Sequence, residues 1–398
     1  MKSSHAYLAS LICRSFLVLS VGAWLLVGAS AARATGVFPG ADWQVATPES
    51  QGLDSAKLNA TMTYLASISH SDGNSCAVVI RHGYLVWQGT TIDRQLSAWS
   101  MTKSLMGAAM GTMVDDGWCS LSDKAYTYLP ALSPTYSNVT LGHFATLTSG
   151  YNYQDDSHPL VPNATPKFAP GTKMCYDLAP DEMSNVLTHI LNQHISNQTL
   201  YTRFKNRIGD PIGMTGWTWG TVGTVDGLTI NGGTGIDQQA IQISARQLAR
   251  FGLLYLNHGN WNGTQLISES WVTQTTQPQV PATTPCYDNN AWYSYLPGRY
   301  GDYFWTNAAV NGQRLWPSGP ADTFLAQGNM NQFCMVIPEW DMVIVRMGAD
   351  GAIPNNLFPG VYDGIFSRME QALPEPATLA LLGLGAAALA ARRRRARA

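Results

Sequence analysis

The chain has 398 residues, 45% of them apolar, and a formal net charge of −2 at pH 7. This length and composition provide ample material for a hydrophobic core and predict a globular protein of one or two domains. The charge balance shows no basic excess and disfavours a nucleic-acid-binding protein.

The first 34 residues have the three parts of a secretory signal. Lys2 and Arg14 precede the apolar run "SFLVLSVGAWLLVGA", and the small residues Ala32 and Ala34 follow it. A membrane anchor that stays uncleaved is the alternative, but the apolar run is short for a permanent span. We therefore expect export and cleavage after Ala34.

A helix and a hairpin are predicted next. The segment 54–68, "DSAKLNATMTYLASI", has apolar residues at helical spacing, and Asp54 or Ser55 is placed to cap it. The segment 75–89, "SCAVVIRHGYLVWQG", has two β-rich runs around His82 and Gly83, which is typical of a hairpin.

The stretch "AWSMTKSLMGAAMG", residues 98–111, brings a serine and a lysine to the start of a helix. Ser100 and Lys103 are three residues apart, so their side chains share one helix face. The helix dipole would stabilise an oxyanion at Ser100, and together with burial it would favour a neutral Lys103 that takes the serine proton. The alternative is a capping serine and a solvated lysine. The apolar neighbours disfavour it: Trp99, Met101, Leu105 and Met106.

Residues 116–277 alternate helical segments with loops rich in Gly, Pro and Trp, which predicts a mostly helical region. Within it, Tyr176 follows a Pro170-Gly171 turn and precedes a helical run. Its phenol could act as a base if cations such as Lys103 drew off its proton; a core tyrosine is the alternative.

Short strands return near the end of the body. The segments 301–310, 322–328, 332–340 and 341–348 are aromatic and β-branched, and a closing helix is expected over about 356–373. We therefore predict an α+β fold: one antiparallel sheet flanked by helices, with the mostly helical region inserted and an active-site cleft between the two parts. The turn at Gly328 leads into a strand whose edge could offer an N–H to an oxyanion hole shared with Ser100. A plain hairpin turn is the alternative.

The last residues, 374–398, resemble a sorting signal. A Pro374-Glu375-Pro376 break precedes an apolar stretch at 377–391 and an arginine cluster at 392–397. The stretch is marginal for a span, and it has no polar face that would make it an amphipathic helix of the domain. It resembles the PEP-CTERM tail of exported Gram-negative bacterial proteins. This resemblance implies a membrane anchor before processing and a sorting protease as partner. It also implies a location in the periplasm, at the cell surface or in the extracellular matrix.

Removing both ends leaves an acidic body. The ends hold eight of the 24 Lys and Arg residues and one of the 26 Asp and Glu residues, which leaves 16 against 25 and a net charge near −9. Nucleic acid is therefore not an expected partner. No cysteine pair has C-x-x-C spacing, so no structural zinc is expected, while export permits up to two disulfides. Their pairing stays open among Cys76, Cys119, Cys175, Cys286 and Cys334.

Several segments between about residues 75 and 348 resemble the β-lactamase-related serine hydrolases, which include class C β-lactamases, D-Ala-D-Ala peptidases, esterases and nylon-oligomer hydrolases. The segments are "VVIRHGYLVWQG", "SMTKS", "NVTLGHFATLTSGYNY", "FKNRIGDPIGMTGWTW" and "ARQLARFGLLYLNHGNWNGTQLISESWV". The resemblance implies Ser100 as nucleophile, Lys103 and Tyr176 as its activating groups, an acyl-enzyme, and no metal or organic cofactor. The hydrolase domain is expected at 35–373, with a sheet part at about 35–115 and 290–373 and a helical part at about 116–289.

Two departures from the family pattern bear on the substrate. Tyr176-Asp177-Leu178 replaces a frequent Tyr-x-Asn, and Asn329-Met330-Asn331 replaces Lys-Thr-Gly or His-x-Gly. The missing cation removes a partner for a penicillin carboxylate, which favours small-molecule or short-peptide esters and amides. The strand-edge donor is expected at the N–H of Asn331 or Gln332.

Two alternative functions stay open. A β-lactamase or D-Ala-D-Ala carboxypeptidase would use the same serine, lysine and tyrosine. An inactive module could hold cell-wall or exopolysaccharide fragments on exposed tryptophans such as Trp217, Trp219, Trp305 or Trp316, although most tryptophans are expected in the core or in cleft walls. A lipase-like α/β-hydrolase is excluded because the chain has no G-x-S-x-G sequence.

Overall fold

The computed structural model describes residues 36–68, 72–152, 165–176, 179–287, 293–349 and 358–374. The predicted signal segment, Asp177, Leu178 and the tail from Glu375 onward lie outside the described residues.

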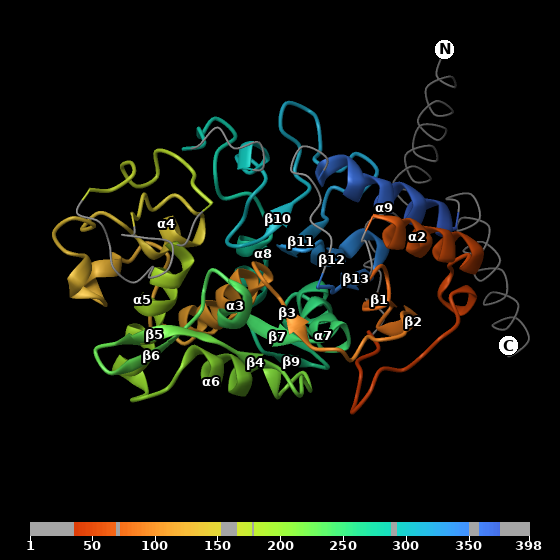
Figure 1. Ribbon diagram of the computed structural model, residues 1–398, viewed down its shortest axis with the longest axis horizontal. Helices are drawn as coiled ribbons and strands as arrows, with labels where there is room; N and C mark the ends of the chain where they lie inside the picture. The colour runs from red at the N-terminus through yellow and green to blue at the C-terminus, as the bar shows by residue number, and fades with distance from the viewer. Residues whose placement is uncertain are drawn as a thin grey trace, which may run out of the picture. The chain divides into compact units, whose positions relative to one another are not determined.

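A six-stranded antiparallel sheet joins the two ends of the body (Figure 1). Its order is β10-β11-β12-β13-β1-β2, and Ala77 of β1 pairs with Arg346 of β13. The prediction that early and late strands share one sheet is therefore confirmed. The strands are β1 (Ala77–Arg81), β2 (Tyr84–Gln88), β10 (Trp305–Thr306), β11 (Phe324–Gly328), β12 (Gln332–Ile337) and β13 (Met342–Arg346).

Helices cover both faces of this sheet. On one face lie α2 (Ser55–Ser67) and α9 (Phe358–Ala372), where the ring of Phe333 on β12 is 5.2 Å from that of Tyr362. The next residue on β12, Cys334, faces α7 (Ala245–Leu256), which packs closely because a Cβ on Gly252 would lie 2.8 Å from the Cys334 Sγ. The predicted N-cap of α2 is confirmed, because the Asp54 side chain accepts the Lys57 N–H.

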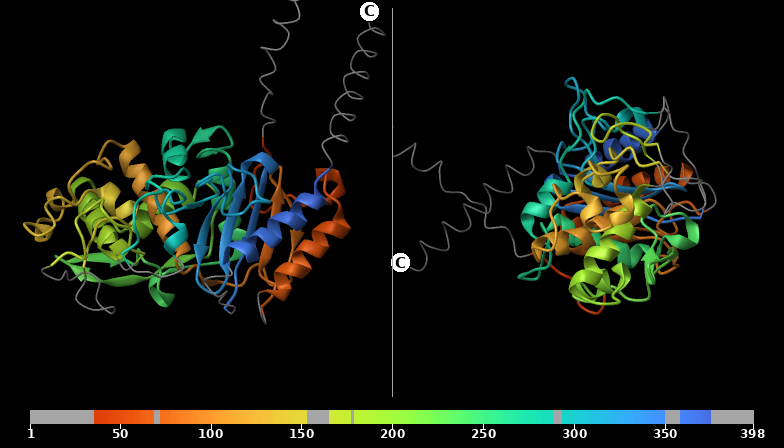
Figure 2. Two further views of the ribbon diagram at one scale, coloured as in Figure 1. Left: turned by 90° about the horizontal axis from the view of Figure 1, so that it is seen from above. Right: turned by 90° about the vertical axis from the view of Figure 1, so that its left-hand side faces the viewer.

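The region expected to be mostly helical also contributes strands to three small sheets, one of which is the green hairpin β5-β6 in Figure 2. They are β3-β7-β4, β5-β6 and β8-β9. Glycine and threonine residues between 218 and 231 favour the β5-β6 hairpin over a helix, which periodicity alone did not predict. The region is also not separate from the main sheet, because α7 packs on β12 and β13. The strands are β3 (Leu96–Ser97), β4 (Thr218–Trp219), β5 (Thr221–Val225), β6 (Leu228–Asn231), β7 (Ile241–Ile243), β8 (Asn260–Trp261) and β9 (Thr264–Gln265).

The central helix α3 (Met101–Asp115) links the two parts of the fold (Figure 1). It contacts β11 and β12 of the main sheet on one side and α5 and α6 on the other. Every residue from Met101 to Met113 is buried, so the helix is fixed from all sides. The remaining helices are α4 (Leu141–Ala145), α5 (Ala179–His194), α6 (Leu200–Phe204) and α8 (Glu269–Thr275).

Within the described ranges, no helix has the length and apolar character needed to cross a membrane. Three of the five body cysteines, Cys76, Cys119 and Cys334, are free thiols. The upper limit of two disulfides that the sequence permitted is therefore not reached.

Candidate active site

Ser100 stands at the N-terminus of the buried helix α3. It occupies the N-cap position, but its side chain makes no capping hydrogen bond, so the Oγ is not used to close the helix. The preceding residue, Trp99, has a positive φ of 48°, a strained conformation for a large side chain that functional sites often hold. The interpretation of Ser100 as a plain cap does not fit this geometry.

Lys103 is buried directly beside Ser100. Its side chain is only 1% exposed, which rules out the alternative of a solvated lysine. The Nζ lies 2.9 Å from the Ser100 Oγ and 2.5 Å from the carbonyl oxygen of Thr234. Both distances are within hydrogen-bond range, so the amine is held where it can exchange a proton with the serine.

Tyr176 completes the group. The Lys103 Nζ lies 4.7 Å from the centre of its ring, and its hydroxyl hydrogen-bonds to the Ser100 side chain. Burial raises the pKa of Tyr176 to about 12, although the hydrogen bond to Ser100 acts in the opposite direction. The phenol therefore stays protonated near neutral pH, and the expectation that nearby cations draw off its proton is not supported.

Asp181, at the start of α5, binds the loop whose Thr234 carbonyl contacts Lys103. Its Oδ1 accepts the backbone N–H groups of Gly233 at 2.6 Å and of Thr234 at 2.8 Å, and it is fully buried. Burial raises the pKa of Asp181, while those hydrogen bonds and the charge of Lys103 counteract the rise. The carboxylate thus fixes the peptide whose carbonyl receives Lys103.

The glycines on both sides of Thr234 allow the loop at 231–235 to lie close to the N-terminal ends of α5 and α3. A Cβ on Gly233 would lie 2.1 Å from the carbonyl oxygen of Pro180, and one on Gly235 would lie 2.0 Å from that of Trp99. Only glycine fits at such distances. Sequence reasoning did not single out Asp181 or this loop; the run "NGGTG" at 231–235 was the available signal.

A second buried carboxyl adjoins the first. Glu182 accepts hydrogen bonds from the Tyr151 hydroxyl at 2.9 Å and from the Asn185 amide at 3.2 Å. Burial raises the pKa of Glu182 to about 8, and the charge of Asp181 acts in the same direction. Glu182 is therefore largely protonated at neutral pH.

The strand-edge residues lie on the β11–β12 hairpin. Gly328 lies against the segment before Ser100, since a Cβ there would be 2.5 Å from the Ala98 carbonyl oxygen. Asn331 lies in the turn with a φ of 57°, and the N–H of Gln332 donates to the carbonyl of Asn329 at 3.4 Å. This weak bond directs the Gln332 N–H into the hairpin, so the structure does not favour that residue as an oxyanion donor.

Arg346 is fully buried and contacts this hairpin turn. Its guanidinium donates to the carbonyls of Met330, Asn331 and Gly73 at 2.6, 3.2 and 3.1 Å. It therefore holds the turn from below and does not replace the missing cation on the strand edge.

The tryptophans considered as exposed saccharide platforms are not exposed. Their exposed fractions are between 0% and 6%, so they belong to the core: Trp217, Trp219, Trp305 and Trp316. Among the described residues no cluster of three or more His, Cys, Asp or Glu side chains is arranged to hold a metal ion.

Two family models match the chain. The beta-lactamase model matches residues 76–350, and the model of the PEP-CTERM protein-sorting motif matches residues 372–395. The second match indicates export and sorting to the cell surface.

Individual proteins similar to the chain support the same fold. An uncharacterized protein of Alkalihalophilus pseudofirmus is 21% identical over 64% of this chain and 73% of its own length. The structure of a putative 6-aminohexanoate-dimer hydrolase from Bacillus anthracis aligns with a TM-score of 0.55 and 20% identity over 75% of this chain and 80% of that one. A family VIII carboxylesterase aligns with a TM-score of 0.58 and 16% identity over 81% and 99% of the two chains.

Proposed function

Because the chain belongs to the beta-lactamase family, we propose that it is an exported serine hydrolase that cleaves an ester or amide bond through an acyl-enzyme on Ser100. The observation that carries this proposal is the distance of 2.9 Å between the Lys103 Nζ and the Ser100 Oγ at a buried helix N-terminus. A buried amine next to a serine hydroxyl that caps nothing is the arrangement expected of an activated nucleophile.

In the first step, the neutral form of Lys103 takes the proton of Ser100 as the Oγ attacks the substrate carbonyl. A bond forms between Oγ and the carbonyl carbon, and the carbonyl oxygen becomes negative. The N-terminus of α3 presents the Ser100 N–H and the helix dipole to that charge. The Thr234 carbonyl, 2.5 Å from the Nζ, stabilises the ammonium that results.

We assign the second oxyanion donor to the N–H of Asn329. Gly328 pairs with Gln332 on β12, while on the opposite edge of β11 the Asn307 N–H donates to the Thr323 carbonyl at 2.9 Å. Backbone groups alternate between the two edges of a strand, so odd-numbered residues of β11 point away from β12. We infer that Asn329, the first residue of the turn after β11, continues this alternation, so that its N–H faces the edge of β11 beside the segment that leads to Ser100.

Tyr176 then serves as the proton donor to the leaving group. Its protonated phenol is already hydrogen-bonded to the Ser100 side chain, where the leaving oxygen or nitrogen departs. The ammonium of Lys103 returns a proton to the phenolate, which leaves both groups as they began. Water attacks the acyl-enzyme by the same steps in reverse and releases the acid.

An uncharged acyl group suits this site better than a penicillin. Among the described residues, Arg346 contacts the turn at Asn329 to Asn331, and it is not available to a substrate carboxylate because it is buried and bonded to backbone carbonyls. Esters and amides without that carboxylate are therefore the proposed substrate class. A sorting protease is proposed to act near Pro374, in keeping with the PEP-CTERM match.

Labelling with a fluorophosphonate tests the proposal. We expect covalent modification of the wild-type body, identified by mass spectrometry on the peptide that contains Ser100, and none in Ser100→Ala. Ser104→Ala is a matched control on the same helix, since its Oγ donates to the Tyr303 carbonyl at 2.6 Å and is not free to react. Failure of the wild type to react with both the fluorophosphonate and short p-nitrophenyl esters would remove the proposal.

A further inference from the structure

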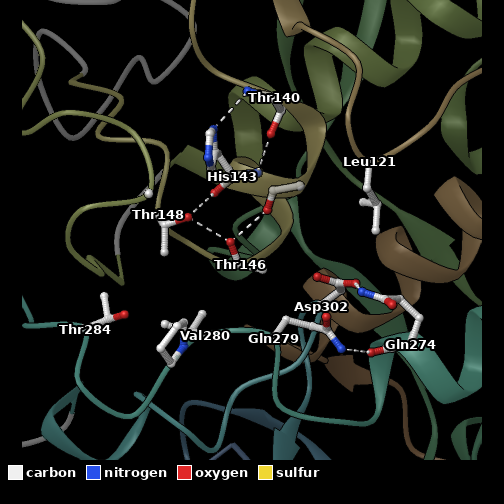
Figure 3. A pocket seen from close by; sticks show the side chains of 13 residues that line it. Leu121, Thr140, His143, Thr146, Thr148, Gln274, Gln279, Val280, Thr284 and Asp302 are labelled. Atoms are coloured by element: carbon white, nitrogen blue, oxygen red, sulfur yellow. Dashed lines mark hydrogen bonds between the residues drawn. The ribbon is translucent and has the colours of Figure 1, made fainter.

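Figure 3 shows a pocket that the proposed catalytic residues do not line. It has a volume of about 310 Å³, and Ser100, Lys103 and Tyr176 are not among the residues that line it. One side is formed by α4 and the residues after it, and the other by the end of α8 and the loops that follow. Figure 3 shows His143, Thr146 and Thr148 across the pocket from Gln274, Gln279 and Asp302.

Asp302 lines this pocket and carries a buried, unsatisfied acceptor. The residue is 1% exposed, and its Oδ2 accepts a long hydrogen bond of 3.4 Å from the Gln274 amide. No described residue donates a hydrogen bond to its Oδ1. A buried carboxyl oxygen without a donor is costly, so a ligand that donates a hydrogen bond would be stabilised there. Burial also raises the pKa of Asp302 to about 7, so the group is in part neutral near pH 7.

His143 presents a donor to the same pocket. The Thr140 N–H donates to its Nδ1 at 3.1 Å, so the neutral ring carries its proton on Nε2. Burial lowers the pKa of His143, which favours this neutral form. Gly171 leaves the space beside the ring open, because a Cβ there would lie 3.2 Å from Nε2.

Two threonine hydroxyls add an acceptor. Thr146 donates to the Gly142 carbonyl at 2.8 Å, and its Oγ1 is 2.8 Å from that of Thr148. Since Thr146 has used its proton, the Thr148 hydroxyl donates to Thr146 or, at 3.5 Å, to the His143 carbonyl, and in both cases it keeps lone pairs for a ligand. Leu121, Val280 and Pro281 supply apolar surface between the polar groups.

We propose that this pocket binds a neutral polyhydroxylated molecule of monosaccharide size, separately from the catalytic site. Hydroxyl groups donate and accept, so one hydroxyl can donate to Asp302 while another accepts from His143. A cation would suit Asp302 but would oppose the N–H of His143, and an anion would be repelled by the ionised Asp302. The apolar residues can contact the C–H face of a sugar ring.

Calorimetric titration of the full chain with D-glucose, D-galactose and D-mannose tests this proposal. We expect at least one sugar to bind at one site per chain. In Asp302→Asn the Gln274 amide takes the one remaining oxygen, so an NH2 group replaces the acceptor Oδ1; this variant should weaken that binding about tenfold or more, as should Thr148→Val. Turnover of a short ester should stay unchanged in Asp302→Asn. Asp322→Asn is the matched control, because Asp322 lines a different pocket, beside Tyr255 and Phe324.

Any one of the following outcomes would overturn the proposal. The first is no saturable binding of any of the three sugars below about 100 mM, a concentration that covers very weak sites. The second is equal binding by the wild type and both variants, or loss of binding when Ser100 is labelled by a fluorophosphonate, which would move the sugar to the catalytic site. The third is tighter binding of methylammonium than of any sugar. Thermal unfolding of each variant confirms that it is folded.

Discussion

The Oδ1 of Asp181 accepts the N–H of Thr234 at 2.8 Å, and the carbonyl of Thr234 lies 2.5 Å from the Nζ of Lys103. A carboxylate on α5 is thus connected to the amine on α3 through a single residue. Asp181 does not reach the substrate, so we regard it as a positioning residue for Lys103.

Asp181→Asn tests this connection. The amide oxygen can still accept the loop N–H groups, so the fold should be kept, but the negative charge that favours the ammonium of Lys103 is lost. We expect kcat to fall about tenfold and the acidic limb of the pH–rate profile to move to lower pH. Asp181→Ala should also lose about 1–3 kcal/mol of stability, because the loop donors lose a buried acceptor. A pH profile equal to that of the wild type, or a shift equal to that of the exposed control Asp237→Asn, would show that Asp181 is only structural.

Tyr176→Phe separates proton donation from proton removal. If Tyr176 protonates the leaving group, kcat should fall about a hundredfold for alkyl esters and amides, whose leaving groups need a proton. A p-nitrophenyl ester should be much less affected, because nitrophenolate leaves without one. Lys103→Ala should slow both substrates by about a hundredfold or more. Equal losses for both substrates in Tyr176→Phe would instead support a tyrosinate base.

Gly328→Ala tests the close approach of the strand edge to the nucleophile. The new methyl group would lie 2.5 Å from the Ala98 carbonyl oxygen, so β11 must move away from the segment before Ser100. We expect a loss of about 1–3 kcal/mol of stability and a larger loss of kcat, since the oxyanion donors are separated. Gly40→Ala is the control, because no atom lies within 4 Å of its Cβ position. Normal kcat in a folded Gly328→Ala would argue against the strand edge as part of the site.

Nitrocefin tests the proposed substrate class. Its carboxylate cannot pair with Arg346, the described cation that contacts the turn at Asn329 to Asn331, because that guanidinium is bonded to backbone carbonyls. We expect kcat/KM for nitrocefin to be at least about a hundredfold below that for a short p-nitrophenyl ester, the loss expected for one missing charged contact. Comparable values for the two substrates would favour the β-lactamase alternative.

Local features of the fold were predictable because they depend on neighbouring residues. The β1–β2 hairpin and helix α2 follow from short-range periodicity, and the proximity of Ser100 to Lys103 follows from helical geometry. The predicted strand at 301–310 reduces to Trp305–Thr306, because Tyr303 has a φ of 66° that a strand cannot accommodate. Periodicity carries no information about that dihedral angle.

The contact between Asp181 and the loop that holds Lys103 was not predictable, because it joins segments that are distant in the sequence. Asp181 lies 52 and 53 residues from Gly233 and Thr234, so no sequence spacing relates them. The protonation state of Tyr176 also depends on burial by residues that the fold alone brings together. The assignment of the second oxyanion donor to the N–H of Asn329 also required the pairing register of β11, which the sequence does not give.

Glu182 predicts that stability decreases as the pH rises. Burial raises its pKa from 4.5 in the unfolded chain to about 8 in the folded protein. Between these values the folded state holds a proton that the unfolded state has lost. This group therefore lowers the free energy of unfolding by about 1.4 kcal/mol per pH unit across that window, and its effect is absent below pH 4.5. Glu182→Gln keeps an acceptor for Tyr151 but cannot titrate, so its stability relative to the wild type should increase from pH 5 to pH 8. Urea unfolding at several pH values measures this difference, with the exposed Glu370→Gln as control. A constant difference across that range would mean that Glu182 is ionised in the folded protein.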